Sequence, residues 1–68
     1  MSVVIVYETG TDNQYTYTSS PRNAVIAAYA QSQGDWQTWN YEKNYGHLVQ
    51  EVNGSFRIGN FSAKKGKS

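Results

Sequence analysis

Runs of apolar residues and alternating patterns divide the chain into strands, one main helix and turns. Residues 3–7 (VVIVY) are apolar at every position and mostly β-branched, which predicts an inner strand of a sheet. Residues 10–13 (GTDN) are of the types that favour a turn. In residues 14–18 aromatic and hydroxyl side chains alternate, so Tyr15 and Tyr17 share one face of a second strand. This part of the chain is expected to form a β-hairpin.

A helix is predicted next, from residue 21 to about residue 33. Ser20 can cap the free N–H groups of its first turn, and Pro21 fits the first helical position because its missing N–H costs nothing there. Gly34 suits the left-handed residue that ends a helix. We expect an apolar stripe to pack against the sheet; it contains Val25, Ala28 and Tyr29, with Ile26 and Ala30 beside it.

The clearest local signal is a second hairpin over residues 47–52 and 55–61. The intervening Asn53-Gly54 pair is typical of a two-residue type I′ turn. The turn sets a register that pairs Val52 with Ser55, Gln50 with Arg57 and Leu48 with Gly59. The opposite face then carries the residues expected in the core, namely Val49, Phe56 and Ile58.

The order β-β-α-β-β indicates an α+β domain, in which one helix packs across one face of a small antiparallel sheet. A chain of 68 residues is too short for two cores, so residues 1–62 are expected to form one domain. The sequence has no cysteine, and its ten aromatic residues (six Tyr, two Trp and two Phe) are the expected source of packing. Residues 63–68 (AKKGKS) are expected to be a flexible basic tail.

Residues 35–46 (DWQTWNYEKNYG) are compatible with a short helix or an irregular strand. We favour a turn or two of helix, which places Trp36 beside Trp39 and Tyr41 beside Tyr45. These rings either complete a small core or form an exposed anchor for a partner, since Trp and Tyr dominate binding energy at interfaces. We expect a division in which the tryptophans are more buried and the tyrosines more exposed.

Charge is low overall and unevenly distributed. The net charge is +1, but residues 1–52 sum to −3 and residues 53–68 sum to +4. This balance excludes a strongly basic nucleic-acid binder and an acidic DNA mimic. A single-strand binding site remains an alternative, because sheet aromatics beside a basic end can stack bases and hold phosphates. Its candidate residues are Tyr15, Tyr17, Arg57, Lys64, Lys65 and Lys67. The competing interpretation is that both tyrosines pack under the helix and the tail only aids solubility.

Catalytic chemistry has little support in the sequence. His47 is the only histidine, and Asp35 or Glu42 could orient it, but an ordinary strand-end histidine explains it as well. The carboxylates form no acidic motif, the glycines form no phosphate loop, and no metal-ligand spacing is present. We therefore expect no enzyme, no cofactor and no metal. A short apolar start without a basic leader, and no cysteine, favour a cytoplasmic protein that does not contact membranes.

Three segments resemble a family of short proteins encoded by bacterial phages, plasmids and metagenomic islands: residues 24–31 (AVIAAYAQ), 34–42 (GDWQTWNYE) and 45–49 (YGHLV). The resemblance covers about residues 21–61. In that family the last strand tends to read valine, a small residue and Gly-Asp, whereas here Ile58-Gly59-Asn60-Phe61 lacks the acid. The resemblance implies a mobile-element setting rather than a particular activity. Compact mobile-element proteins without catalytic machinery often inhibit host systems, including CRISPR effectors, by covering a working surface.

These observations favour a small, non-catalytic binding protein from a mobile element, an inhibitor of a host defence complex in the manner of an anti-CRISPR protein. Its partner would be a host protein or nucleoprotein complex, bound by protein–protein contact. The expected contact residues are Trp39, Tyr41, Tyr45 and Arg57. A homodimer formed through an exposed sheet face is a further interpretation.

Overall fold

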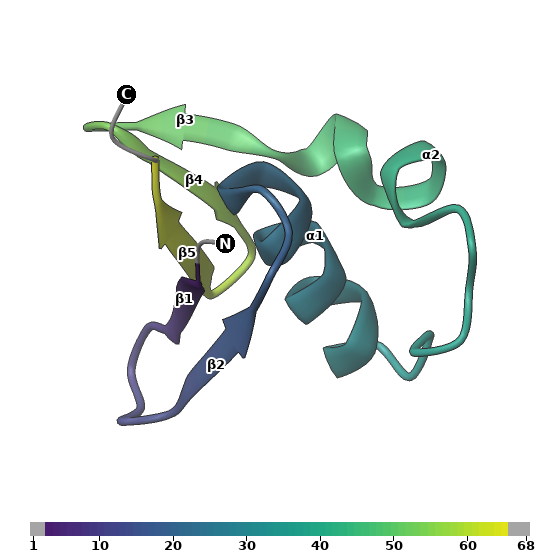
Figure 1. Ribbon diagram of the computed structural model, residues 1–68, viewed down its shortest axis with the longest axis horizontal. Coiled ribbons are helices and arrows are strands. Elements are labelled where there is room, and N and C mark those ends of the chain that lie inside the picture. The colour runs from purple at the N-terminus through teal and green to yellow at the C-terminus, as the bar shows by residue number, and fades with distance from the viewer. Residues whose placement is uncertain (1–2, 66–68) are drawn as a thin grey trace.

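The computed structural model describes residues 3–65 as a five-stranded antiparallel sheet with its helices on one side (Figure 1). The strand order is β2-β1-β5-β4-β3. The strands are β1 (Val4–Glu8), β2 (Gln14–Tyr17), β3 (Gln50–Val52), β4 (Ser55–Ile58) and β5 (Phe61–Lys64). The α+β class, with a helix laid across one face of a small sheet, is confirmed. The strand predicted over residues 3–7 is an inner strand, between β2 and β5.

Helix α1 (Pro21–Ser32) begins and ends where the sequence predicts. The Ser20 hydroxyl accepts a hydrogen bond from the backbone N–H of Asn23 at 3.3 Å, and the proline occupies the start of the first turn. Gly34 follows with a φ of 83°, the left-handed conformation that favours glycine. The predicted stripe of α1 faces the sheet.

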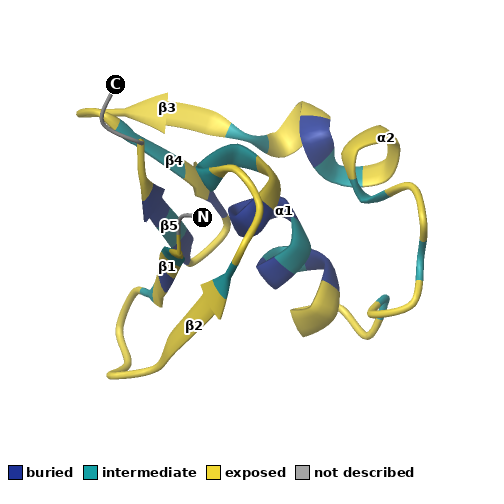
Figure 2. Cartoon of the chain, in the orientation of Figure 1, coloured by how far each residue is buried: buried dark blue, intermediate teal, exposed yellow. Residues whose placement is uncertain are grey.

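The core lies between α1 and the sheet (Figure 2). Its buried members come from the helix and from the three central strands: Val6, Ala24, Val25, Ile26, Ala28, Ile58, Phe61 and Ala63. Val49 and Phe56, which were expected in the core with Ile58, are partly buried and pack against it. The small residues of α1 let the helix approach the sheet closely.

The Asn53-Gly54 hairpin forms as predicted. Both residues have positive φ, 53° and 78°, as a type I′ turn requires. The Val52–Ser55 and Gln50–Arg57 pairs are confirmed. The Leu48–Gly59 pair is wrong, because β3 begins only at Gln50 and Leu48 lies in a short 3₁₀ helix, η1 (Gly46–Leu48).

Residues 55–61 are not one strand, because the chain turns back at Gly59-Asn60. Ile58 pairs with Phe61 across this second two-residue turn, and Gly59 has a φ of 59°. The turn places β5 between β1 and β4, in the middle of the sheet. A Gly-Asn pair between apolar residues is itself a hairpin signal, so this turn was visible in the sequence.

The prediction of a flexible tail over residues 63–68 is wrong for the first residues of that segment. Ala63 has an exposed fraction of 0% and lies opposite both Val6 and Phe56. Lys65 continues the sheet through a backbone hydrogen bond from its N–H to the carbonyl oxygen of Gly54, at 2.9 Å. The remainder of the expected tail, including Lys67, lies outside the described residues.

The ambiguous stretch forms a loop followed by a short helix, α2 (Tyr41–Tyr45), which contacts α1. A helical turn is therefore present, and Tyr41 and Tyr45 share it as predicted. Trp36 and Trp39 lie before it, in the loop over residues 34–40 that we call the Trp loop. No helix among residues 3–65 is long and apolar enough to cross a membrane.

Candidate functional site

The Trp loop starts from a tightly closed helix end. After Gly34, the chain returns toward α1, and the backbone N–H of Asp35 donates to the carbonyl oxygen of Ala30 at 2.9 Å. This bond fixes the direction in which the loop leaves the helix. Trp36 therefore begins from a defined position rather than from a frayed end.

A hydrogen bond between side chains closes the base of the loop. The Tyr45 hydroxyl donates to Asp35 Oδ2 at 2.9 Å, joining the residue after Gly34 to the last residue of α2. This bond favours the protonated phenol and is the main reason that the pKa of Tyr45 is raised above its ordinary value, with burial adding to it. The Tyr45 ring also meets the Tyr29 ring of α1 edge-on, with 5.7 Å between centroids.

Further contacts hold α2 against α1. The Arg22 guanidinium forms an ion pair with the Glu42 carboxylate and donates to the carbonyl oxygen of Gly46 at 3.3 Å. Within the loop, Thr38 Oγ1 accepts from the Asn40 backbone N–H and from the Asn44 side-chain amide, each at 3.4 Å. The loop is thus tied at its base and braced by polar contacts inside.

The tryptophan side chains project from this braced loop into solvent. Trp39 is 96% exposed and Trp36 is 64% exposed. Tyr41 and Tyr45, in contrast, are partly buried and pack against the core. The predicted division of the aromatic residues is therefore reversed, because α2 turns its tyrosines toward α1 and leaves the tryptophans in the preceding loop.

The four predicted partner-contact residues do not form one surface. Tyr41 and Tyr45 pack against the core, and Tyr45 is also bonded to Asp35 of the Trp loop, while Trp39 is exposed. Arg57 lies on β4, in an exposed position across the sheet from Gln50 and Ser62. In Figure 1 the loop joining α1 and α2 is at the right edge, and the strands are at the left.

The residues of the predicted single-strand site are also separated. Tyr15 and Tyr17 lie on the helix side of the sheet, opposite Val6 and Val4. Their hydroxyls donate to Glu8 Oε1 at 2.8 Å and to Gln31 Oε1 at 3.3 Å. The interpretation that these tyrosines pack on the helix side is thus the better one for Tyr17, which contacts the core.

The basic residues divide between the two sides of the sheet. Arg57 and Lys64 alternate with buried neighbours and so point away from the helices. Lys65 lies on the other side and forms a 2.6 Å ion pair with Glu51. The proposed combination of Tyr15 and Tyr17 with these cations is therefore not brought together.

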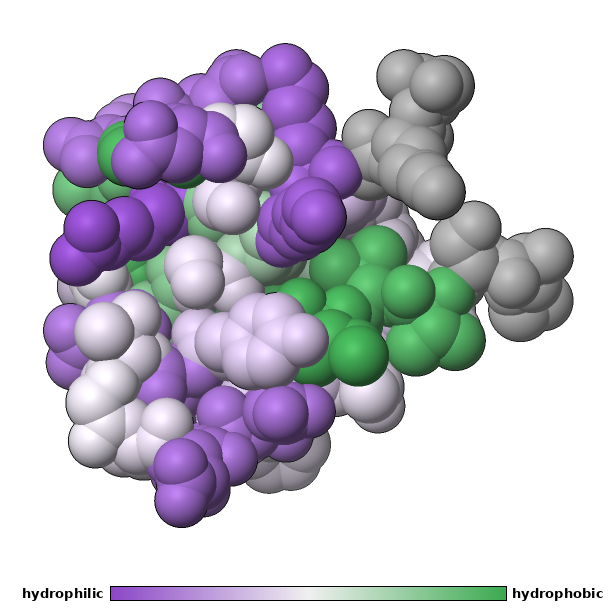
Figure 3. Space-filling view, turned by 90° about the vertical axis from the view of Figure 1, so that its left-hand side faces the viewer, coloured by the Kyte–Doolittle hydropathy of each residue, from purple (hydrophilic) through white to green (hydrophobic). Residues whose placement is uncertain are grey.

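The side of the sheet away from the helices is the kind of exposed sheet face that the homodimer interpretation requires, but sequence reasoning did not identify Ile5 and Tyr7 as exposed on it. We call it the open face; its strand residues are Ile5, Tyr7, Gln14, Thr16, Gln50, Val52, Ser55, Arg57, Ser62 and Lys64. Figure 3 shows this side, with a hydrophobic patch bordered by polar side chains. The apolar run over residues 3–7 predicts an inner strand, which β1 is, yet Val3, Ile5 and Tyr7 are exposed.

The residues considered for catalysis are dispersed. His47 is exposed on η1, while Asp35 is bonded to Tyr45 and Glu42 is paired with Arg22. Both carboxylates that could orient the histidine are therefore engaged elsewhere. Among residues 3–65, no three His, Cys, Asp or Glu side chains lie close enough together to hold a metal ion.

Comparisons with protein-family models, with curated proteins and with solved structures gave no match to this chain.

Proposed function

We propose that this chain is a non-catalytic binding protein whose Trp loop docks into a pocket on a partner protein. The observation that carries the proposal is the 96% exposure of Trp39. An indole ring offers a large apolar area, roughly 150–250 Å² per aromatic side chain, whose transfer from water to an interface is favourable. Tryptophan is also among the residues most enriched in interface hot spots.

The bracing of the loop supports the proposal independently of exposure. Binding costs less free energy when the binding segment already has its bound conformation. The Asp35–Tyr45 hydrogen bond and the Arg22–Glu42 ion pair restrict the loop before any partner arrives. A loop that is held at its base and carries exposed tryptophans has the features of a preformed anchor.

Capture of partners from bacterial lysate, treated with nuclease, tests this function. Immobilised wild-type protein is compared with Trp39→Ala and with the matched surface variants His47→Ala and Lys43→Ala. We expect Trp39→Ala to lose the captured protein and both controls to retain it. With the purified partner, the Trp39→Ala substitution should weaken binding by about 2 kcal/mol or more, roughly thirtyfold. Equal capture by wild type and Trp39→Ala would contradict the proposal.

Within this proposal, the resemblance to phage and plasmid proteins favours a host defence complex, such as a CRISPR effector, as the partner. The chain would then act stoichiometrically by covering a working surface. Phage plating on a host with an active defence system measures this directly. Wild-type protein should restore plating, His47→Ala should restore it equally, and Trp39→Ala should behave like an empty vector. Plating that depends on His47 instead would point to catalysis.

A further inference from the structure

The open face carries a continuous row of side chains across all five strands. Backbone register places Gln14 opposite Tyr7, Tyr7 opposite Ser62, Ser62 opposite Arg57, and Arg57 opposite Gln50. Neighbouring strands are about 4.8 Å apart, so Tyr7 and Arg57 are separated by about 10 Å. The row thus combines an aromatic ring, a guanidinium group, a hydroxyl and two amides on one side of the sheet.

The charge of this face has a single sign. Arg57 and Lys64 are both exposed there, and the described strand residues of the open face include no Asp or Glu. The acids of the strands point to the helix side, where Glu8 accepts from Tyr15 and Glu51 pairs with Lys65. The open face therefore complements an anionic partner.

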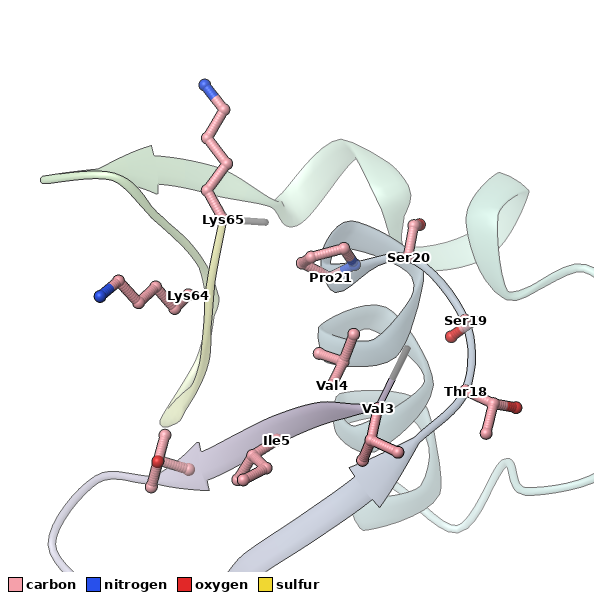
Figure 4. A pocket seen from close by; sticks show the side chains of 10 residues that line it. Val3, Val4, Ile5, Thr18, Ser19, Ser20, Pro21, Lys64 and Lys65 are labelled. Carbon is pink, nitrogen blue, oxygen red and sulfur yellow. The ribbon is translucent and has the colours of Figure 1, made fainter. Parts of the chain in front are cut away.

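A groove at one end of the sheet borders the open face, and of the two cations of that face it is lined by Lys64 alone, while Lys65 in its lining is paired with Glu51. Its volume is about 830 Å³, and its lining includes Val3, Ile5, Tyr7, Lys64 and Lys65. In the close view, Val3 and Ile5 lie together, and the side chains of Lys64 and Lys65 extend away from them (Figure 4). Tyr7 is 46% exposed, which leaves ring area free for stacking.

We propose that the open face binds single-stranded nucleic acid, with Tyr7 stacking on a base and Arg57 and Lys64 contacting phosphates. Bases have flat apolar faces that stack on aromatic rings, and their edges can bond to the amides and hydroxyls of the row. A duplex hides its base faces, so Tyr7 could not stack on it. This site is separate from the Trp loop and goes beyond the protein-binding function.

Fluorescence anisotropy with a labelled twelve-nucleotide single strand, its duplex and a polyglutamate of equal charge tests the proposal at low salt. We expect the single strand to bind more tightly than both other probes. Two phosphate contacts predict a slope of about −1.4 for log K against log salt, and Arg57→Gln should reduce it by about 0.7. Tyr7→Ala should weaken single-strand binding by about five- to a hundredfold, and Tyr7→Phe should retain it.

The controls separate this site from the Trp loop. Trp39→Ala should bind the oligonucleotide like wild type, and Lys43→Ala should leave the salt slope unchanged. Thermal unfolding of each variant shows whether the fold is intact, and Arg57→Gln keeps the test valid if Tyr7→Ala unfolds. The proposal would be overturned if polyglutamate or the duplex bound as tightly as the single strand. It would also be overturned if light scattering showed a dimer that blocks binding, or if Tyr7→Ala and Arg57→Gln both bound like wild type.

Discussion

Gly59 and Tyr29 connect the C-terminal turn to the support of the Trp loop. Gly59 has a φ of 59°, and a Cβ built there would lie 2.8 Å from Cε1 of Tyr29. The Tyr29 ring meets Phe61 edge-on at 6.5 Å and Tyr45 at 5.7 Å between centroids. Only glycine gives the ring this space while adopting the turn without strain. The position of Tyr29 therefore depends on a residue without a side chain.

Gly59→Ala should destabilise the fold more than Gly54→Ala. Both residues have positive φ, 59° and 78°, so both substitutions strain the backbone, but a Cβ at Gly54 has no atom within 4 Å. Displacing the Tyr29 ring should add about 1–3 kcal/mol to the cost at Gly59. Urea unfolding of the two variants gives the difference, and equal costs would show that Tyr29 moves aside freely.

Tyr45→Phe should reduce the loss of stability at alkaline pH. The hydrogen bond to Asp35 raises the pKa of Tyr45 in the folded state, so folding favours the protonated phenol. This stabilisation is fully present below the ordinary tyrosine pKa of about 10 and is lost as pH rises through the raised folded-state pKa.

Free energies of unfolding measured between about pH 7 and pH 11 test this predicted loss of stability with rising pH. Wild type should lose more stability above pH 10 than Tyr45→Phe does. Part of the alkaline loss should remain in the variant, because the hydrogen bond to Glu8 raises the pKa of Tyr15 and burial raises that of Tyr17. Parallel curves for the two proteins would mean that the Asp35–Tyr45 bond is absent in solution.

At the scale of elements, sequence patterns predict those features whose signals are local. The cap at Ser20, the stop at Gly34 and the Asn53-Gly54 turn each depend on neighbouring residues, and all three are confirmed. Strand β5 was missed because basic residues follow Ala63, which gave the segment the composition of a tail. Its place depends on pairing with β1, more than fifty residues earlier in the chain.

The prediction of which aromatic residues are buried was wrong for a similar reason. Sequence spacing shows that Tyr41 and Tyr45 share a helical face, but not which side that face meets. The choice is made by contacts with α1, through the Arg22–Glu42 pair and the Tyr29 ring. Likewise, the apolar run of β1 does not reveal that its second face remains uncovered. Placement between distant elements, rather than local propensity, decides the candidate sites.

Ala63→Glu should prevent stable folding, although the sequence makes this residue look like part of a tail. Ala63 is fully buried between the sheet and α1, so the substitution would bury a carboxylate without a partner. We expect a cost of about 3 kcal/mol or more. The neighbouring Lys64→Gln on the open face should change stability by less than about 0.5 kcal/mol. Thermal unfolding of both variants decides whether β5 is a structural strand, and a folded Ala63→Glu would contradict it.

Across the whole molecule, the two candidate surfaces lie on different sides of one small core. The Trp loop is carried by α1 and α2, whereas the open face is the side of the sheet without helices (Figures 1 and 3). The sheet and α1 form two layers, and each layer has an outer side, so even a small domain can keep the two surfaces apart. A partner bound at the loop would therefore leave the open face accessible, so the chain could bind a protein and a single strand together.

Tryptophan fluorescence tests the central claim most directly, because both tryptophans of the chain are in the Trp loop. In the free, folded protein, acrylamide should quench their emission almost as efficiently as that of free tryptophan. Addition of the purified partner should shift the emission to shorter wavelength and protect it from quenching, and Trp39→Ala should lose affinity by about thirtyfold without a change in thermal stability. Emission that is already protected in the free protein, or quenching that stays unchanged when the partner is saturated, would contradict the account.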